Sequence, residues 1–186
     1  MKTGTAEERY AAPRAITGET VRRARKTLGL TQRSFAQLIN VSLPTVERWE
    51  AGEGQIKGPV TVLLTLLLAE RGLEDLLVIP ARTTRLRLYY MYREQLCTII
   101  DVDERKKQLQ IRNYTDDDQM RAFGVIEDPS FEQYEAFLSS RCFPAERDKM
   151  KLMLRDLELP FYDPFLIIEK TEGRMAEDDF WIRIER

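Results

Sequence analysis

The sequence of 186 residues contains no histidine and only two cysteines, Cys97 and Cys142. Without histidine, neither a Ser-His-Asp triad nor a Cys-His pair can form, and the commonest ligand of transition metals is missing. Two cysteines provide neither a disulfide framework nor a zinc-binding set. We therefore expect a protein that binds no metal or cofactor and that is not an enzyme.

Long apolar segments are absent as well. The longest apolar run, Val60 to Ala69, is far shorter than the ~20 residues that a membrane-spanning helix needs. No apolar signal core follows Lys2. The hydrophobic fraction of 43% is ordinary for a globular protein. These features together predict a globular, cytoplasmic protein that does not contact the membrane.

The net charge of −2 is unevenly distributed along the chain. Residues 1–72 carry 11 Lys and Arg against 7 Asp and Glu, whereas the remaining residues carry 18 against 24. A basic first part beside an acidic second part predicts that the first part contacts a polyanion and that the second does not.

The chain is predicted to contain two domains, a tail and a linker. Residues 1–16 are mixed and polar and are expected to form a flexible tail. Residues 17–72 carry apolar side chains at helical spacing. Residues 73–83, which include a proline, are the predicted linker to residues 84–186.

Four short helices are predicted within residues 17–72. Thr17, Thr31 and Ser42 are expected N-caps, because a hydroxyl can accept a hydrogen bond from the free amides of a first turn. Proline in a first turn loses no helical hydrogen bond, which suits Pro44 and Pro59. The helices are expected to end at Gly29, Asn40, Gly52 and Gly72. The fourth helix is expected to bury a stripe of Val60, Leu63, Leu64, Leu67 and Leu68.

From residue 84 onward the apolar pattern changes from helical spacing to alternation. It predicts strands at 85–92, 96–102, 108–114 and 180–184, an acidic loop at 116–118, and helices at 131–138, 145–157 and 164–169. Three successive strands favour an antiparallel meander. The predicted fold is therefore an all-α helix-turn-helix domain followed by a small α+β domain with an antiparallel sheet.

The segment LTQRSFAQLINVSLPTVERWEAGEG, which starts at Leu30, resembles the helix-turn-helix of the Xre and lambda-repressor superfamily, and the resemblance covers residues 17–70. The matching elements are Leu30-Thr31-Gln32, Phe35-Ala36, Val41-Ser42, Thr45-Val46 and Trp49-Glu50-x-Gly52. Gly58-Pro59 before a leucine-rich helix is similar to the antitoxin branch that includes MqsA and HigA. The resemblance implies a bacterial-type DNA-binding transcription regulator, either a repressor or an antitoxin-like protein.

In this kind of domain the N-terminal end of the third helix enters the major groove of double-stranded DNA. The side chains expected to face outward there are Leu43, Pro44, Thr45 and Arg48. Arg48 can donate two hydrogen bonds to a guanine edge, and the apolar groups can contact thymine methyls. The resemblance implies that Gln32 contacts a phosphate or a base. The expected phosphate contacts are Ser42, Arg33 and Lys57.

Each of these side chains also has an alternative role. Arg48 could pair with Glu47 or Glu50, and Leu43 and Pro44 could pack on a neighbour. The basic cluster Arg22, Arg23, Arg25 and Lys26 could be a solvated helix face.

Specific binding usually needs two copies ~34 Å apart on the DNA. We therefore expect a homodimer, and we expect residues 84–186 to form its interface.

The second part has a fainter resemblance to an accessory module of clostridial HipA-like kinase chains. It is carried by Arg141, Pro144, Arg147, Asp178, Phe180, Trp181 and Ile182. The resemblance implies a protein partner, either a toxin or a kinase, that binds residues 84–186. A dimerisation or effector domain without a kinase link is the alternative.

Acidic clusters leave a third function open, a metal-dependent nuclease. Residues 116–118 and 177–179 could bind Mg²⁺, although Glu169-Lys170 lacks the spacing of a Glu-x-Lys nuclease strand.

The two cysteines are expected to differ in their surroundings. Cys97 is expected in the core. Arg141 beside Cys142 could lower the pKa of that thiol and make it a redox sensor, unless the thiol is buried.

Overall fold

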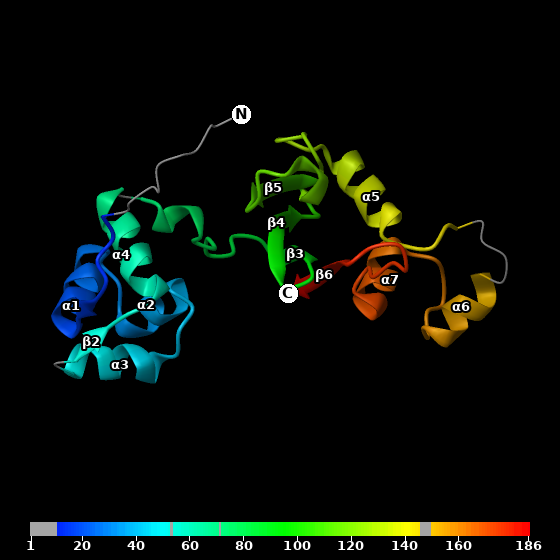
Figure 1. Ribbon diagram of the computed structural model, residues 1–186. Coiled ribbons are helices and arrows are strands. Elements are labelled where there is room, and N and C mark those ends of the chain that lie inside the picture. The colour runs from blue at the N-terminus through cyan, green and yellow to red at the C-terminus, as the bar shows by residue number, and fades with distance from the viewer. Residues whose placement is uncertain (1–10, 53, 71, 146–149) are drawn as a thin grey trace, which may run out of the picture. The chain divides into compact units, whose positions relative to one another are not determined.

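The computed structural model describes residues 11–52, 54–70, 72–145 and 150–186. The chain divides into two compact units, Met1–Ile79 and Pro80–Arg186 (Figure 1). This division falls inside the segment predicted as a linker. The predicted flexible tail lies outside the described residues up to residue 10, but its last residue, Ile16, is buried in a strand of the first unit.

The first unit is built from α1 (Gly18–Thr27), α2 (Gln32–Leu38), α3 (Leu43–Ala51) and α4 (Pro59–Ala69), followed by the short 3-10 helix η1 (Glu74–Leu76). Two short strands, β1 (Ile16–Thr17) and β2 (Gln55–Ile56), pair antiparallel and were not predicted. Thr17, Thr31 and Ser42 each accept a hydrogen bond from an amide of the helix that they precede, as predicted.

Helix α4 departs from the prediction in two ways. It ends at Ala69 rather than at Gly72. Its buried residues are Thr61, Leu64 and Leu67, whereas Leu63, expected in the buried stripe, is 37% exposed. The prediction was wrong at Leu63 because this helix is apolar on nearly every side, and such a sequence does not reveal which side faces the core.

The start of α1 lies against the end of α3. A Cβ atom at Gly18 would lie 1.9 Å from the carbonyl oxygen of Trp49 and 2.9 Å from that of Gly52. Backbone oxygen atoms cannot move away as a flexible side chain can. Glycine at position 18 is therefore required by this close approach of the two helices.

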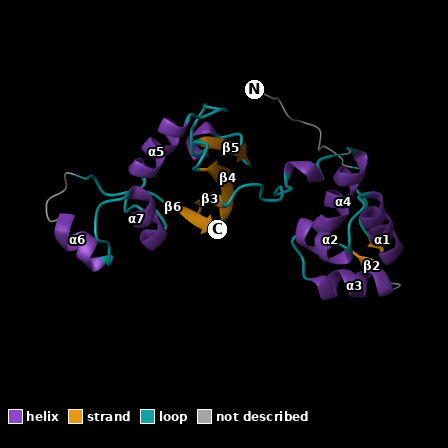
Figure 2. Ribbon diagram, turned by 180° about the vertical axis from the view of Figure 1, so that it is seen from behind, coloured by secondary structure: helices purple, strands orange, loops and turns teal. Residues whose placement is uncertain are grey.

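The second unit contains one four-stranded antiparallel sheet (Figure 2). Its strands are β3 (Leu86–Tyr92), β4 (Gln95–Asp103), β5 (Gln108–Asn113) and β6 (Phe180–Glu185), in the order β5-β4-β3-β6. The first three form the predicted meander, and β6 pairs with β3, so that Leu88 lies opposite both Ile100 and Ile184.

The described residues of this unit also form α5 (Phe131–Ser140), α6 (Met150–Asp156) and α7 (Pro164–Thr171). The 3-10 helix η2 (Asp118–Met120) begins at the last residue of the predicted acidic loop. Residues 146–149 of the predicted helix at 145–157 lie outside the described residues. A helical unit followed by an α+β unit with antiparallel strands confirms the predicted fold class.

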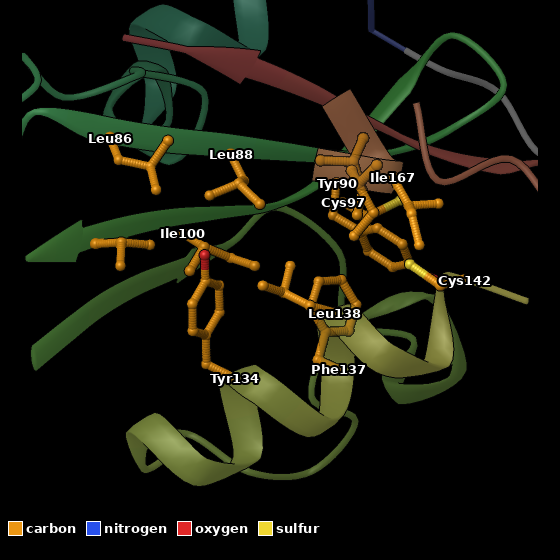
Figure 3. Close-up of a cluster of buried hydrophobic side chains, with 13 residues drawn as sticks. Leu86, Leu88, Tyr90, Cys97, Ile100, Tyr134, Phe137, Leu138, Cys142 and Ile167 are labelled. Carbon is orange, nitrogen blue, oxygen red and sulfur yellow. The ribbon is translucent and has the colours of Figure 1, made fainter. Parts of the chain in front are cut away.

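The core of the second unit is formed by side chains of the sheet, α5 and α7. Tyr134, Phe137 and Leu138 point from α5 toward β3 and β4 (Figure 3). Leu88 and Ile100 meet them from the strands, and both are fully buried. The alternation that predicted the strands thus also separates the side chains of this core from those on the opposite face of the sheet.

A buried ion pair occupies that opposite face. The Arg87 guanidinium donates to both carboxylate oxygens of Asp101, at 2.7 and 2.6 Å, and both residues are buried. The third donor, Nη1 of Arg87, binds the carbonyl oxygen of Pro80 at 2.7 Å. The first residue of this unit is thereby fixed to the sheet.

Candidate nucleic-acid interface

Helices α2 and α3 are joined by a tight turn whose central residue is Asn40. Its φ of 54° is left-handed, which asparagine tolerates better than most residues. The amide of Val41 then donates to the carbonyl of Ala36 at 2.9 Å, and this bond closes the turn. Phe35, Ala36 and Val46 are buried where the two helices meet. The turn and these side chains fix the angle between α2 and α3.

A buried carboxylate near the end of α3 ties the helices together. Glu50 accepts hydrogen bonds from Nε and Nη2 of Arg25 at 2.6 and 3.0 Å and from Nε2 of Gln32 at 3.0 Å. Arg25 lies on α1 and Gln32 is the first residue of α2. Arg22 adds a hydrogen bond from its Nη2 atom to the carbonyl oxygen of Glu50, at 2.6 Å.

These contacts stabilise the charged forms of both partners. The hydrogen bond from Arg25, followed by that from Gln32, lowers the pKa of Glu50 despite the opposing effect of burial. The hydrogen bond to Glu50 raises the pKa of Arg25. Arg22 and Arg25 therefore hold α3 in place, so the basic cluster on α1 is more than a solvated face. The sequence reasoning did not identify Glu50 as the centre of this network.

The predicted DNA-contacting residues differ in exposure. Arg33, Ser42, Pro44, Arg48 and Lys57 are exposed, whereas Gln32, Leu43 and Thr45 are half-buried. Leu43 packs against the core of the helical unit instead of facing outward as expected. Thr45 shares a hydrogen bond of 2.8 Å between its hydroxyl and that of Ser42. Pro44 and Arg48 are thus the most accessible members of the predicted set on α3.

Arg48 is the one long cation among the predicted residues of α3. Neither Glu47 nor Glu50 pairs with it, and within the described residues its guanidinium has no hydrogen-bond or ion-pair partner. Glu50 is instead occupied by Arg25 and Gln32. Among the described residues, none occupies the five N–H donors of Arg48.

Gln32 is oriented by its bond to Glu50. A carboxylate accepts but cannot donate, so the amide nitrogen of Gln32 must face Glu50. That nitrogen carries a second hydrogen, and the bond to Glu50 fixes where it points. Contact with DNA by Gln32, or by any other residue of the predicted set, stays a prediction.

In the second unit, residues of the fainter resemblance come together around Arg141. This buried guanidinium donates to both oxygens of Asp178, at 2.7 and 3.0 Å, and to the carbonyl oxygens of Gly173 and Phe180. Trp181 donates instead to the carbonyl oxygen of Arg93, at 2.7 Å. Arg147 lies outside the described residues. These contacts give Arg141 and Asp178 a structural role.

Both cysteines are buried, as expected for Cys97. Burial raises the pKa of Cys142 to about 12 and outweighs the opposite effect of Arg141. The redox-sensor interpretation of Cys142 is therefore wrong, because a thiol with a raised pKa forms little of the reactive thiolate.

The structure gives no support to the nuclease. In the described parts of the chain, no group of three or more His, Cys, Asp or Glu side chains is placed to hold a metal ion. Residues 169 and 170 lie in α7 and not in a strand.

The described residues of the chain contain no helix long and apolar enough to cross a membrane.

Comparison with known proteins supports the first unit alone. The family model described as a helix-turn-helix matches residues 21–64, which run from α1 into α4. No curated protein and no solved structure matches the chain. The match indicates a DNA-binding transcription regulator with a helix-turn-helix of the Xre and lambda-repressor type. The MqsA and HigA branch and the HipA-like module stay predictions.

Proposed function

We propose that the chain is a cytoplasmic transcription repressor that binds specific DNA sequences as a homodimer. The observation that carries the proposal is Arg48. Its guanidinium is exposed on α3 and has no partner among the described residues, while the Glu50 network holds the same helix rigidly. Arg48 lies in the last turn of α3, so in this proposal its long side chain reaches a base edge while the N-terminal end of the helix enters the major groove.

In this proposal some residues of the interface contact bases and others contact the phosphate backbone. Arg48 donates two hydrogen bonds to a guanine edge, and Pro44 and the Thr45 methyl contact thymine methyls. Ser42, Arg33, Lys57 and Gln32 contact the phosphate backbone and set the register of the protein on the duplex. Because the Thr45 hydroxyl is bonded to Ser42, Arg48 is the main polar reader. Affinity then depends strongly on backbone contacts and on DNA shape.

Band shifts with DNA from upstream of the gene test this function. We expect salt-sensitive, sequence-selective binding, and Arg48→Ala should cost about 1–3 kcal/mol on the specific site. Lys57→Ala should weaken binding to all sequences and reduce the salt slope by about one. Arg105→Ala, an exposed arginine of the second unit, is the matched control. Absence of selective binding, or an Arg48→Ala protein that binds like the wild type, contradicts the proposal.

An antitoxin or protein-interaction adaptor is the second candidate function. It is favoured by exposed apolar side chains in the acidic second unit, where Val125 is 74% and Phe161 57% exposed. Val125 is followed directly by Ile126, which is 36% exposed, and adjoining exposed apolar side chains are a feature of protein-binding surfaces. Purification of the tagged full chain from a native extract tests this candidate. A partner should be recovered at a fixed ratio and lost with Phe161→Asp; its absence, or its retention by that variant, counts against it.

A further inference from the structure

A cleft lies at the end of the sheet where β3 begins and β4 ends. Its volume is about 400 Å³, and ligand pockets for small molecules occupy about 300–1,000 Å³. We call it the Arg85 cleft, and its lining residues are Arg82, Arg85, Leu86, Glu104, Phe165 and Arg186. All of them belong to the second unit, and none is among the predicted DNA contacts. The cleft is therefore a separate candidate site of small-molecule size.

Two opposite charges of this cleft have no partner. Arg85 and Glu104 are both exposed. Within the described residues neither side chain has a hydrogen-bond or ion-pair partner, so they do not pair with each other although they line the same cleft. Arg186, by contrast, pairs with Glu169 at 2.9 Å. A guanidinium and a carboxylate that line one cleft and stay apart are suited to a ligand that carries both complementary charges.

A second hollow adjoins the Arg85 cleft. Its volume is about 290 Å³, and Glu104 and Phe165 line both spaces. Glu135 and Asp163 line the second hollow, whereas the arginines line the Arg85 cleft. Cationic groups therefore belong to one of the two spaces, further carboxylates belong to the other, and Glu104 and Phe165 are common to both.

Apolar side chains provide the remaining walls. Leu86 lines the Arg85 cleft and Leu138 lines the second hollow. Both are buried side chains of the core that Figure 3 shows. Phe165 lies between them as a partly buried ring that packs against this core. An apolar group of a ligand that covered Phe165 would leave water, which is favourable.

We propose that this site binds a zwitterion, namely an α-amino acid with an apolar side chain. Its carboxylate accepts hydrogen bonds from Arg85, its ammonium group donates to Glu104, and its side chain packs on Phe165. A simple organic acid would satisfy Arg85 but would be repelled by Glu104, and a simple amine would meet the opposite situation. The site therefore favours a ligand with both charges over a ligand with either one alone.

An NMR titration of the isotope-labelled full chain tests the site. The probe is L-phenylalanine, which is compared with hydrocinnamate, the same molecule without its ammonium group, and with phenethylamine, which lacks the carboxylate. We expect saturable shifts of the amide signals of Arg85, Leu86, Glu104 and Phe165, with a dissociation constant in the millimolar range or below. Each compound that lacks one charged group should bind about tenfold more weakly.

Two variants assign the two charges of the ligand. Arg85→Gln should weaken the binding of L-phenylalanine about tenfold and leave that of phenethylamine unchanged. Glu104→Gln should weaken L-phenylalanine to a similar degree and should not weaken hydrocinnamate. Both positions are exposed, so the variants should keep their fold, which the unshifted signals of the remaining residues check. Arg155→Gln, at an exposed arginine on α6, is the matched control and should bind like the wild type.

Four outcomes overturn the proposal. The first is the absence of saturable shifts with both L-phenylalanine and L-leucine at millimolar concentrations. The second is a set of shifts confined to residues outside the two spaces. The third is equal binding of L-phenylalanine and hydrocinnamate, and the fourth is binding of L-phenylalanine that Arg85→Gln does not weaken.

The inference does not rest on the proposed function, because the titration uses the full chain without DNA. Binding of L-phenylalanine by a chain that binds no DNA supports the amino-acid site and contradicts the proposed function. Selective DNA binding by a chain that binds neither amino acid supports the function and overturns the site.

Discussion

Removal of the Glu50 carboxylate should strongly lower the free energy of unfolding of the first unit, because two other side chains depend on this group for their hydrogen bonds. Glu50→Ala leaves Arg25, whose side chain is 15% exposed, without its partner, and Gln32 without its acceptor. Breaking a buried ion pair on one side costs about 3–5 kcal/mol. Since a domain is stable by only about 5–15 kcal/mol, the variant should lose a large part of the free energy of unfolding of this unit.

Tryptophan fluorescence can follow this unit by itself. The chain has two tryptophans, Trp49 on α3 and Trp181 on β6. In a Trp181→Phe background, urea unfolding monitored by fluorescence reports the first unit. Glu47→Ala, an exposed neighbour on the same helix, is the control and should change the free energy of unfolding by less than about 0.5 kcal/mol.

The same network predicts a pH dependence with a definite sign. Because the native pKa of Glu50 is lowered, its contribution to stability is fully present above the ordinary glutamate pKa of about 4.3 and is lost as the pH falls through the lowered native value. Glu50→Gln should reduce the loss of stability of the first unit at acid pH.

A Glu50→Ala protein whose free energy of unfolding lies within about 1 kcal/mol of that of the Glu47→Ala control, well below the cost of a broken buried pair, would refute the reasoning.

Three further predictions concern other parts of the chain. Gly18→Ala should destabilise the first unit by at least about 1–3 kcal/mol in the same urea assay, because its Cβ would meet backbone oxygen atoms; Gly54→Ala, whose Cβ would meet nothing within 4 Å, should not. Asp101→Ala should cost the second unit about 3–5 kcal/mol by stranding Arg87, and replacing both residues by leucine should recover most of that loss. Cys142 should react with iodoacetamide at pH 8 only when the protein unfolds, since burial raises its pKa to about 12; fast labelling of the native protein would contradict this.

Local signals in the sequence were sufficient for most elements. Thr17, Thr31 and Ser42 cap helices by contacts within three residues, so the sequence alone locates these helix starts. Strand alternation likewise predicted the meander. These features depend on neighbours in the chain, which a single sequence contains.

Long-range contacts could not be derived in this way. Ile16 pairs with Ile56 across the first unit, and each strand has only two residues, too few for alternation to be visible. The sequence showed that Glu50 follows Trp49 in a matching motif, but not that Arg25 and Gln32 converge on it. The exposure of Leu63 was missed because the helix is apolar on nearly every side.

The pairing of β6 with β3 affects how the two units fold. Strand β6 at Phe180–Glu185 must pair with β3 at Leu86–Tyr92 across most of the unit, whereas the paired strands β1 and β2 of the first unit, at Ile16 and Ile56, lie much closer together in the sequence. Domains with such high contact order fold more slowly than helical ones, because the long loop must close before its contacts stabilise it. The DNA-binding unit should therefore reach its native state first, before β6 has paired with β3 in the second unit.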